Sequence, residues 1–311
     1  ASTTGIGLPL LPVHYQYGGC DKRPLGPGQV RFGNDFDRYA RLVEDVAKSV
    51  SSLPADCRTG VAPHSLRAVA AEDIQSVERL AGDGPIHMHL SEQQAEVDEV
   101  IARYGARPVT WFLDNCNAGP RWCLIHCIQM QAEETERLAR TGAVAGICPV
   151  TEASLGDGIF NATGWLGAGG ALAIGSDSNI RISLTEELRA LEYSQLLRDH
   201  SRAALATPHL STGRHLFEIV NRGAAIAAGR NSGEIREGVL ADLVALDDES
   251  TCLDSRSGDA LLDSYIFAGD DRLVTDVWSA GRHLVQNGRH RDHDQITRRY
   301  REIMRELGDA I

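Results

Sequence analysis

The sequence predicts an α/β protein that contains most of a (β/α)₈ TIM-type barrel, followed by a small β-sandwich domain. Three observations predict this fold. Short apolar runs alternate with amphipathic helical stretches, which is typical of a parallel sheet covered by helices. Six such strand–helix units precede residue 230, whereas a closed barrel needs eight. After residue 230 the pattern changes to short alternating strands separated by Gly and Asn turns.

The six expected strands are short and apolar. They cover 6–14, 59–63, 86–90, 123–126, 143–148 and 172–175. The expected helices carry apolar residues at helical spacing and cover 35–51, 65–80, 93–104, 133–140, 184–206 and 211–228. We therefore expect a barrel domain over 1–230 holding strands 3 to 8, the carboxyl-terminal half of the small β-sandwich over 231–290, and a charged terminal helix within 291–311.

Composition excludes several classes of protein. The chain has 311 residues, and no stretch approaches the roughly 20 apolar residues that span a bilayer. It carries 31 Lys and Arg against 43 Asp and Glu, and a net charge of −12 repels a phosphate backbone, so nucleic acid is not an expected partner. The seven cysteines form no framework pattern and the amino end lacks a signal peptide, which together favour a reducing cytoplasm.

The first chemical motif is His87-Met-His89-Leu-Ser-Glu92. On a strand, His87 and His89 point to one face, and Glu92 falls just past the strand end. A neutral imidazole is a metal ligand, and a carboxylate three residues further on can carry protons between water and substrate. A buried histidine followed by an acid at a helix start explains the same residues equally well.

The second motif is Cys123-Leu-Ile-His126-Cys127. Strand alternation sends both cysteines to one face and His126 to the other, so the three side chains do not ligate one ion on a regular strand. We interpret the cysteines as small core residues and His126 as the functional member. A core histidine without a chemical role is the alternative.

The third motif is Gly175-Ser-Asp177-Ser, at the end of an apolar strand. An Asp between small residues suits a metal ligand that also takes a proton from water. A turn or helix-capping Asp is the alternative.

The fourth motif is Pro63-His64-Ser-Leu-Arg67. His64 ends a strand and Arg67 is expected to open the next helix, so both side chains face the same end of the barrel. The planar guanidinium suits a carboxylate. An exposed helical Arg is the alternative.

Together the motifs resemble the amidohydrolase superfamily of metal-dependent deaminases. The shared feature is a His with a following Glu, then a His, then an Asp, at the ends of successive strands with one empty strand before the Asp. Within that superfamily the sequence resembles the N-formimino-L-glutamate deiminases along nearly its whole length. The segments that carry this resemblance are GIGLPLLPVHYQY, VAPHSLRAV, HMHLSEQQAEVDEV, RWCLIHCIQM, GAVAGICPVTEASLGDGIF, IGSDS and EELRALEYSQLLR.

The resemblance implies a role for each motif. His89 and Asp177 would be metal ligands, with Asp177 also the general base, Glu92 the proton shuttle and His126 the group that orients the attacking water. His64 and Arg67 would bind the glutamate portion of the substrate, and His87 would be structural. The family hydrolyses N-formimino-L-glutamate to N-formyl-L-glutamate and ammonia in histidine degradation with one divalent metal, usually zinc. A homodimer and a small-molecule substrate are the expected partners.

The sequence also departs from the family. Family members carry a His-x-His metal-binding pair on the first barrel strand, and we find neither that strand nor the second. We therefore expect the chain to begin partway through a larger protein, about 140 residues downstream of its start, and to bind metal poorly as it stands. Two alternatives stay open: a deaminase of guanine or 8-oxoguanine, and an inactive fragment or non-catalytic relative.

Overall fold

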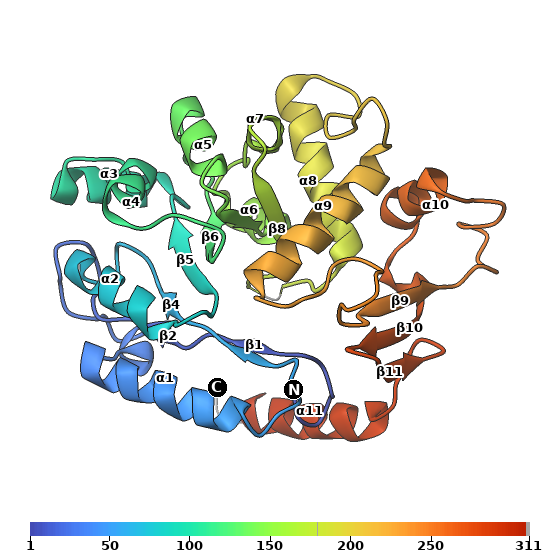
Figure 1. Ribbon diagram of the computed structural model, residues 1–311, viewed down its shortest axis with the longest axis horizontal. Helices are drawn as coiled ribbons and strands as arrows, with labels where there is room; N and C mark the ends of the chain where they lie inside the picture. The colour runs from blue at the N-terminus through green and yellow to red at the C-terminus, as the bar shows by residue number, and fades with distance from the viewer. Residues whose placement is uncertain (179, 309–311) are drawn as a thin grey trace.

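The computed structural model describes residues 1–178 and 180–308 of the chain. At its centre is a parallel sheet in which β5 (Ile86–Leu90), β6 (Trp122–His126), β7 (Val144–Ile147) and β8 (Ala171–Ile174) pair in chain order. Helices follow the strands and flank them (Figure 1). This alternation confirms the predicted α/β class, and β5 covers the predicted range.

The first two predicted strands, 6–14 and 59–63, are each divided in two. The four pieces are β1 (Pro9–Leu10), β2 (Val13–His14), β3 (Arg58–Thr59) and β4 (Ala62–Pro63), with β1 paired to β3 and β2 to β4 in parallel. The division arises because Pro12 has no N–H with which to continue the ladder. Val61 bridges to Ile86, so these strands extend the sheet that begins at β5.

Four of the predicted helices lie close to their expected ranges: α1 (Phe36–Val50), α3 (Gln94–Tyr104), α5 (Ala132–Ala139) and α9 (Thr212–Ala227). Side chains cap the first turns of α1, α5 and α9. The Asp35 carboxylate accepts the Arg38 N–H at 2.7 Å, and the Ser211 hydroxyl accepts an N–H in the first turn of α9.

The other helices differ from prediction. α2 (Ala71–Leu80) begins later than expected because residues 65–70 form a turn closed by the Ser65 carbonyl. α8 (Leu184–Asp199) ends before 206 because His200 adopts a left-handed φ of 50°. Within the predicted barrel domain, three described helices were not predicted: α4 (Pro108–Asn115), α6 (Pro149–Leu155) and α7 (Ala162–Gly167). They are at most eight residues long, too short to show a helical period.

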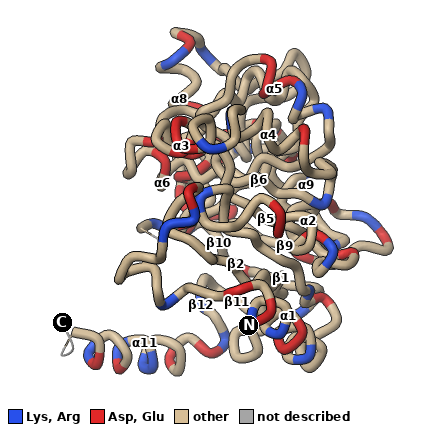
Figure 2. Tube along the Cα trace, turned by 90° about the vertical axis from the view of Figure 1, so that its left-hand side faces the viewer, with Lys and Arg blue, Asp and Glu red and all other residues tan. Residues whose placement is uncertain are grey.

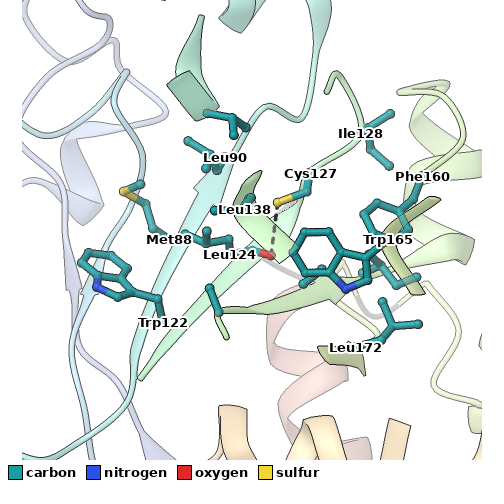
Figure 3. Packing of buried hydrophobic residues seen from close by; sticks show 14 of the residues in the cluster. Met88, Leu90, Trp122, Leu124, Cys127, Ile128, Leu138, Phe160, Trp165 and Leu172 are labelled. Carbon is teal, nitrogen blue, oxygen red and sulfur yellow. Dashed lines mark hydrogen bonds between the residues drawn. The ribbon is translucent and has the colours of Figure 1, made fainter. Parts of the chain in front are cut away.

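The main core lies between the sheet and the flanking helices. Figure 3 shows Met88 and Leu90 of β5 beside Trp122 and Leu124 of β6, with Trp165 of α7 further along the same layer. All five side chains are at most 1% exposed, and each fully buried side chain of this size contributes roughly 1.5–3 kcal/mol to folding.

α9 covers β8 at very short range. A Cβ added to Gly223 would lie 1.9 Å from the Leu172 carbonyl oxygen, so only glycine allows this approach. A smaller apolar cluster beside it joins Cys123, Val144, Ala173 and Ala227.

The carboxyl-terminal part forms one antiparallel sheet in the order β12 (Arg289–His290), β11 (Arg282–Gln286), β10 (Val274–Ser279) and β9 (Leu243–Leu246). The short helix α10 (Asp259–Asp263), a single π-helical turn at Ser264–Ala268 and a 3-10 turn at Asp271–Leu273 lie between β9 and β10. Among the described residues, this carboxyl-terminal part contains one sheet, so the second sheet of a β-sandwich stays a prediction.

The chain ends in α11 (His293–Gly308), within the predicted terminal segment, of which residues 309–311 lie outside the described residues. Figure 2 shows α11 extending from the body, and shows basic and acidic residues interspersed along the chain. Among the described residues, no helix combines the length and the apolar character that a membrane span requires.

Candidate active site

Strand alternation on β5 directs two histidines away from the main core. Met88 and Leu90 are buried among apolar side chains, and His87 and His89 lie on the opposite face. His87 donates its Nε2 hydrogen to the Ala227 carbonyl at 2.8 Å, a contact that holds α9 against the strand. His89 lies two residues further along β5, closer to the carboxyl end of the strand.

Four residues at or just past the strand ends adopt left-handed backbone conformations: Ser91 (φ 58°), His126 (φ 73°), Cys127 (φ 50°) and Asp177 (φ 42°). Such conformations cost of order 1–3 kcal/mol outside glycine and persist only where the surroundings hold them. His126 pairs with Leu90 in the ladder between β5 and β6, so regular strand alternation would direct its side chain into the core, as it directs that of Leu90. Its left-handed turn returns the ring toward His89, at a centroid distance of 5.6 Å.

His89 is held in one tautomer. Its Nδ1 hydrogen is donated to the His64 carbonyl at 2.9 Å, which leaves Nε2 with a free lone pair. Burial is the largest cause that lowers the pKa of His89, and the neighbouring His126 lowers it further. A neutral imidazole with one nitrogen fixed by a carbonyl is the form in which histidine binds metals.

His126 is 1% exposed and has three carboxylates around its ring. Nδ1 lies 3.1 Å from Glu152 Oε1, while Nε2 lies 3.8 Å from Glu92 Oε1 and 3.9 Å from Asp177 Oδ2. Burial by itself lowers the pKa of His126, but the hydrogen bond and charge of Glu152, with the two other carboxylates, raise it overall. The two Nε2 distances exceed a direct hydrogen bond, so Nε2 is not directly hydrogen-bonded to either carboxylate.

Glu92 is positioned by a turn that a second carboxylate holds. Glu96, in the first turn of α3, accepts the N–H of Glu92 at 2.9 Å and that of Ser91 at 3.2 Å. Arg67 Nη2 donates to Glu92 Oε2 at 2.9 Å. Arg67 therefore belongs to the site, but it lies in the turn before α2 and does not open that helix as predicted.

His64 and Arg67 line a cavity of about 210 Å³ together with Tyr15, Gln29 and Gln93. Burial lowers the pKa of His64 to about 3, with smaller contributions from His89 and Arg67, so its ring is neutral at pH 7. Among the described residues, Arg67 Nε is buried without a hydrogen-bond partner.

Asp177 follows β8 in a turn that Thr151 of α6 holds. The Thr151 hydroxyl donates to the Ser176 carbonyl at 3.2 Å and lies 2.9 Å from the Ser178 hydroxyl. The Asp177 side chain is 34% exposed, far more than His126 at 1%. It therefore faces the open end of the site.

The donor chemistry of His89 and Asp177 fits a divalent metal. One offers a free imidazole nitrogen and the other a carboxylate, and zinc takes both kinds of ligand. These are two of the four donors that zinc prefers, so the two residues account for half of such a site.

A second group of potential ligands lies below, where donor atoms of His126, Cys148 and Glu152 all fall within 4.8 Å of one another. Burial raises the pKa of the Cys148 thiol, and the thiolate is the form that binds metal. Glu152 Oε1 already accepts the N–H of Cys148 at 2.8 Å as well as the His126 hydrogen. We interpret this group as a hydrogen-bond cluster.

The model of the amidohydrolase family matches residues 34–284, which is most of the chain. The chain belongs to the amidohydrolase family. The family match, together with 43% identity to a formimidoylglutamate deiminase, makes it a hydrolase that acts on C–N bonds, as the sequence predicts.

Two relatives and two solved structures define its neighbourhood within the amidohydrolases. The chain is 43% identical to a formimidoylglutamate deiminase of Pseudomonas aeruginosa, with 99% of the chain and 68% of that protein covered. It is 30% identical to a 5-methylthioadenosine/S-adenosylhomocysteine deaminase of Haloquadratum walsbyi, covering 73% of the chain and 52% of that protein. The chain thus spans about two thirds of the first relative and about half of the second.

Among solved structures, an amidohydrolase from Brucella melitensis matches with a TM-score of 0.94 and 46% identity over 99% of this chain and 68% of that one. An adenosine deaminase from Xanthomonas campestris with bound zinc matches with a TM-score of 0.83 and 23% identity, covering 98% and 67%. The described strands are therefore those of a TIM-type amidohydrolase barrel.

Sequence reasoning missed three members of this amidohydrolase site: Glu96, Thr151 and Glu152. Each is a polar residue in the first turn or two of a helix that follows a strand. For Thr151 and Glu152 a signal was available, because Pro149 directly after an apolar strand is typical of a helix start.

Proposed function

We propose that this amidohydrolase hydrolyses N-formimino-L-glutamate to N-formyl-L-glutamate and ammonia. The observation that carries the proposal is the contact of Arg67 with Glu92, 2.9 Å apart, at the end of the barrel where His126 and Asp177 also lie. This contact places the guanidinium of Arg67, the proposed anchor for a substrate carboxylate, beside Glu92, the proposed proton shuttle. The 43% identity to a formimidoylglutamate deiminase over 99% of the chain supports the same substrate.

The substrate carries two carboxylates, and the cavity beside Arg67 offers groups that bind them. The planar guanidinium matches a carboxylate fork. The neutral His64 adds a polar ring without a competing charge, and the cavity of about 210 Å³ suits a molecule of amino-acid size. A purine needs amide partners and a stacking surface, and Gln29, Gln93 and Tyr15 of this cavity offer such groups as well. The preference for N-formimino-L-glutamate therefore rests on Arg67 and on the 43% identity to a formimidoylglutamate deiminase.

In the proposed reaction, water adds to the formimino carbon and ammonia leaves from the tetrahedral intermediate. A divalent metal, held in part by His89 and Asp177, would supply activation of the water and polarisation of the C–N bond. Asp177 accepts a proton from the water, and His126 orients that water from Nε2. Glu92 delivers a proton to the imino nitrogen as water adds. The resulting amine takes up the proton held by Asp177 and leaves as ammonia, while the hydroxyl proton of the intermediate returns to Glu92.

The test compares substrates and variants in protein supplied with Zn²⁺. We expect ammonia release from N-formimino-L-glutamate and none from guanine. We expect Glu92→Gln to abolish release while leaving metal content nearly unchanged, because Glu92 is not a proposed ligand. Glu136→Gln, on an exposed site of α5, serves as the control with full activity.

Two outcomes would favour the alternatives. Turnover of guanine but not of N-formimino-L-glutamate would make the protein a purine deaminase. Absence of both activity and bound zinc would support a non-catalytic chain, since the two ligands that we identify supply only half of a zinc site.

Several finer assignments belong to the same proposal. They are zinc as the metal, a homodimer, a role in histidine degradation, and a barrel domain over 1–230 with half of a β-sandwich over 231–290. A reducing cytoplasmic environment is supported by seven cysteines that are all free. Metal analysis, light scattering and cell fractionation test these assignments in turn.

A further inference from the structure

Glu152 has no part in the proposed reaction, yet of the three carboxylates near the His126 ring it lies at the shortest distance. Glu152 is only 3% exposed, and its carboxylate faces Nδ1 of His126, whereas Glu92 and Asp177 lie near Nε2 of the same ring. One oxygen, Oε1, accepts both the His126 Nδ1 hydrogen at 3.1 Å and the Cys148 N–H at 2.8 Å.

Local structure explains why this carboxylate is so firmly placed. Cys148 precedes the first turn of α6 and Pro149 begins it, so the N–H of Cys148 points along the helix start without an intrahelical partner. Glu152 bends back to satisfy that N–H. The helix amino terminus also favours a negative charge at this point.

The placement has a consequence for the imidazole. An ionised carboxylate only accepts hydrogen bonds, so the His126 nitrogen that faces it must carry the hydrogen. Nδ1 is that nitrogen, and Nε2 is thereby presented to Glu92 and Asp177. The bond also opposes rotation of a ring whose own backbone is left-handed, at φ 73°.

We propose that Glu152 is a positioning residue, which fixes the tautomer and orientation of His126 so that Nε2 faces the substrate side of the site. The inference rests on the proposed function for its kinetic consequence, but the tautomer itself is a property of the folded chain. A carboxylate that holds a functional histidine in this way typically contributes a factor of about 10–100 to activity.

The choice of variants follows from the shared oxygen. In Glu152→Gln the Cys148 N–H still needs an acceptor, so the amide oxygen stays where Oε1 lies and continues to accept the Nδ1 hydrogen. Glu152→Leu keeps the volume but has no acceptor. We expect Gln to retain kcat within about 5-fold, and Leu to lower kcat by about 10–100-fold with little change in KM.

Glu134 provides the matched control. It is a buried carboxylate, 4% exposed, which accepts the N–H of Gln131 at the start of α5 and a hydrogen bond from Arg107. It contacts none of the site residues. Glu134→Gln and Glu134→Leu should therefore reproduce any loss of stability from removing a helix-capping carboxylate, without the loss in kcat.

The decisive readout is ¹⁵N NMR of protein labelled at histidine, with the His126 signals assigned by their loss in His126→Gln. We expect a protonated Nδ1 in the native chain and in Glu152→Gln, and loss of that state in Glu152→Leu only. An unprotonated Nδ1 in the native chain, or a Leu variant with unchanged tautomer and kcat, would overturn the inference. If the native chain releases no ammonia from N-formimino-L-glutamate, the proposed function fails while the NMR result still decides the role of Glu152.

Discussion

Asp56 ties together three parts of the chain that are far apart in sequence. Its carboxylate accepts two hydrogen bonds from Arg282 of β11, at 2.8 and 2.7 Å, and one from Arg230 at 3.0 Å. Arg230 follows α9 and also pairs with Asp242 at 2.8 Å. The Asp56 side chain is 3% exposed and that of Arg230 8%, so neither charge is well hydrated.

The size of the effect follows from the pKa of Asp56. The hydrogen bonds from Arg282, and then those from Arg230, outweigh burial and lower this pKa from 3.8 to about 2. Each unit corresponds to about 1.4 kcal/mol, so the ionised form contributes about 2 kcal/mol to the free energy of unfolding. Because the folded pKa lies below the unfolded one, this contribution is present above pH 3.8 and is lost as the pH falls toward 2.

The perturbation is Asp56→Asn, whose amide resembles the protonated acid. We expect the variant to lose at least about 2 kcal/mol at pH 7, since it leaves two arginines near an uncharged group. The difference from the native chain should shrink by about the same amount between pH 5 and pH 2. Urea unfolding followed by fluorescence of the four tryptophans measures both quantities.

Asp45→Asn is the control, because Asp45 is 74% exposed and, among the described residues, its carboxylate pairs with Lys48 alone, at 3.4 Å. Its effect should stay below about 0.5 kcal/mol at either pH. A destabilisation by Asp56→Asn that is the same at pH 7 and at pH 2 would refute the reasoning, since the effect would then not come from the charge.

Two further predictions concern packing and substrate binding. Gly223→Ala should lower the free energy of unfolding by about 1–3 kcal/mol, because the new Cβ would lie 1.9 Å from the Leu172 carbonyl oxygen. Gly167→Ala is the control. Its new Cβ meets no atom within 4 Å, so this variant should be neutral or slightly stabilising. Thermal denaturation separates the two, and equal effects would contradict the packing argument. Arg67→Lys keeps the charge but loses the planar fork, so KM for N-formimino-L-glutamate should rise about tenfold or more. Steady-state assays of ammonia release test this, and an unchanged KM would exclude Arg67 as the carboxylate anchor.

Much of the local structure was predictable because it depends on patterns a few residues long. The apolar alternation of 86–90 predicts β5 to the residue, and Asp35 marks the start of α1. The breaks in the first two strands were not predicted, although the sequence contains Pro12. The missing N–H of a proline interrupts a strand only where a neighbouring strand would accept its hydrogen bond, and the sequence does not show which strand lies alongside. The late start of α2 was missed because the apolar residues of 65–70 have the same spacing in a turn as in the first turn of a helix. The structure forms the turn, which the Ser65 carbonyl closes.

The sequence by itself determined the kinds of groups at the site and their order along the chain. His89 and His126 lie at the carboxyl ends of their strands, Glu92 and Asp177 follow theirs, and the carboxyl ends of parallel strands converge at one end of a barrel. Tertiary structure alone decided how these groups face one another. The left-handed turns at Ser91, His126 and Asp177, and the carboxylates of Glu96 and Glu152 beside them, depend on contacts between separate units. A strained backbone is stable only when such contacts hold it, and no single segment contains both partners.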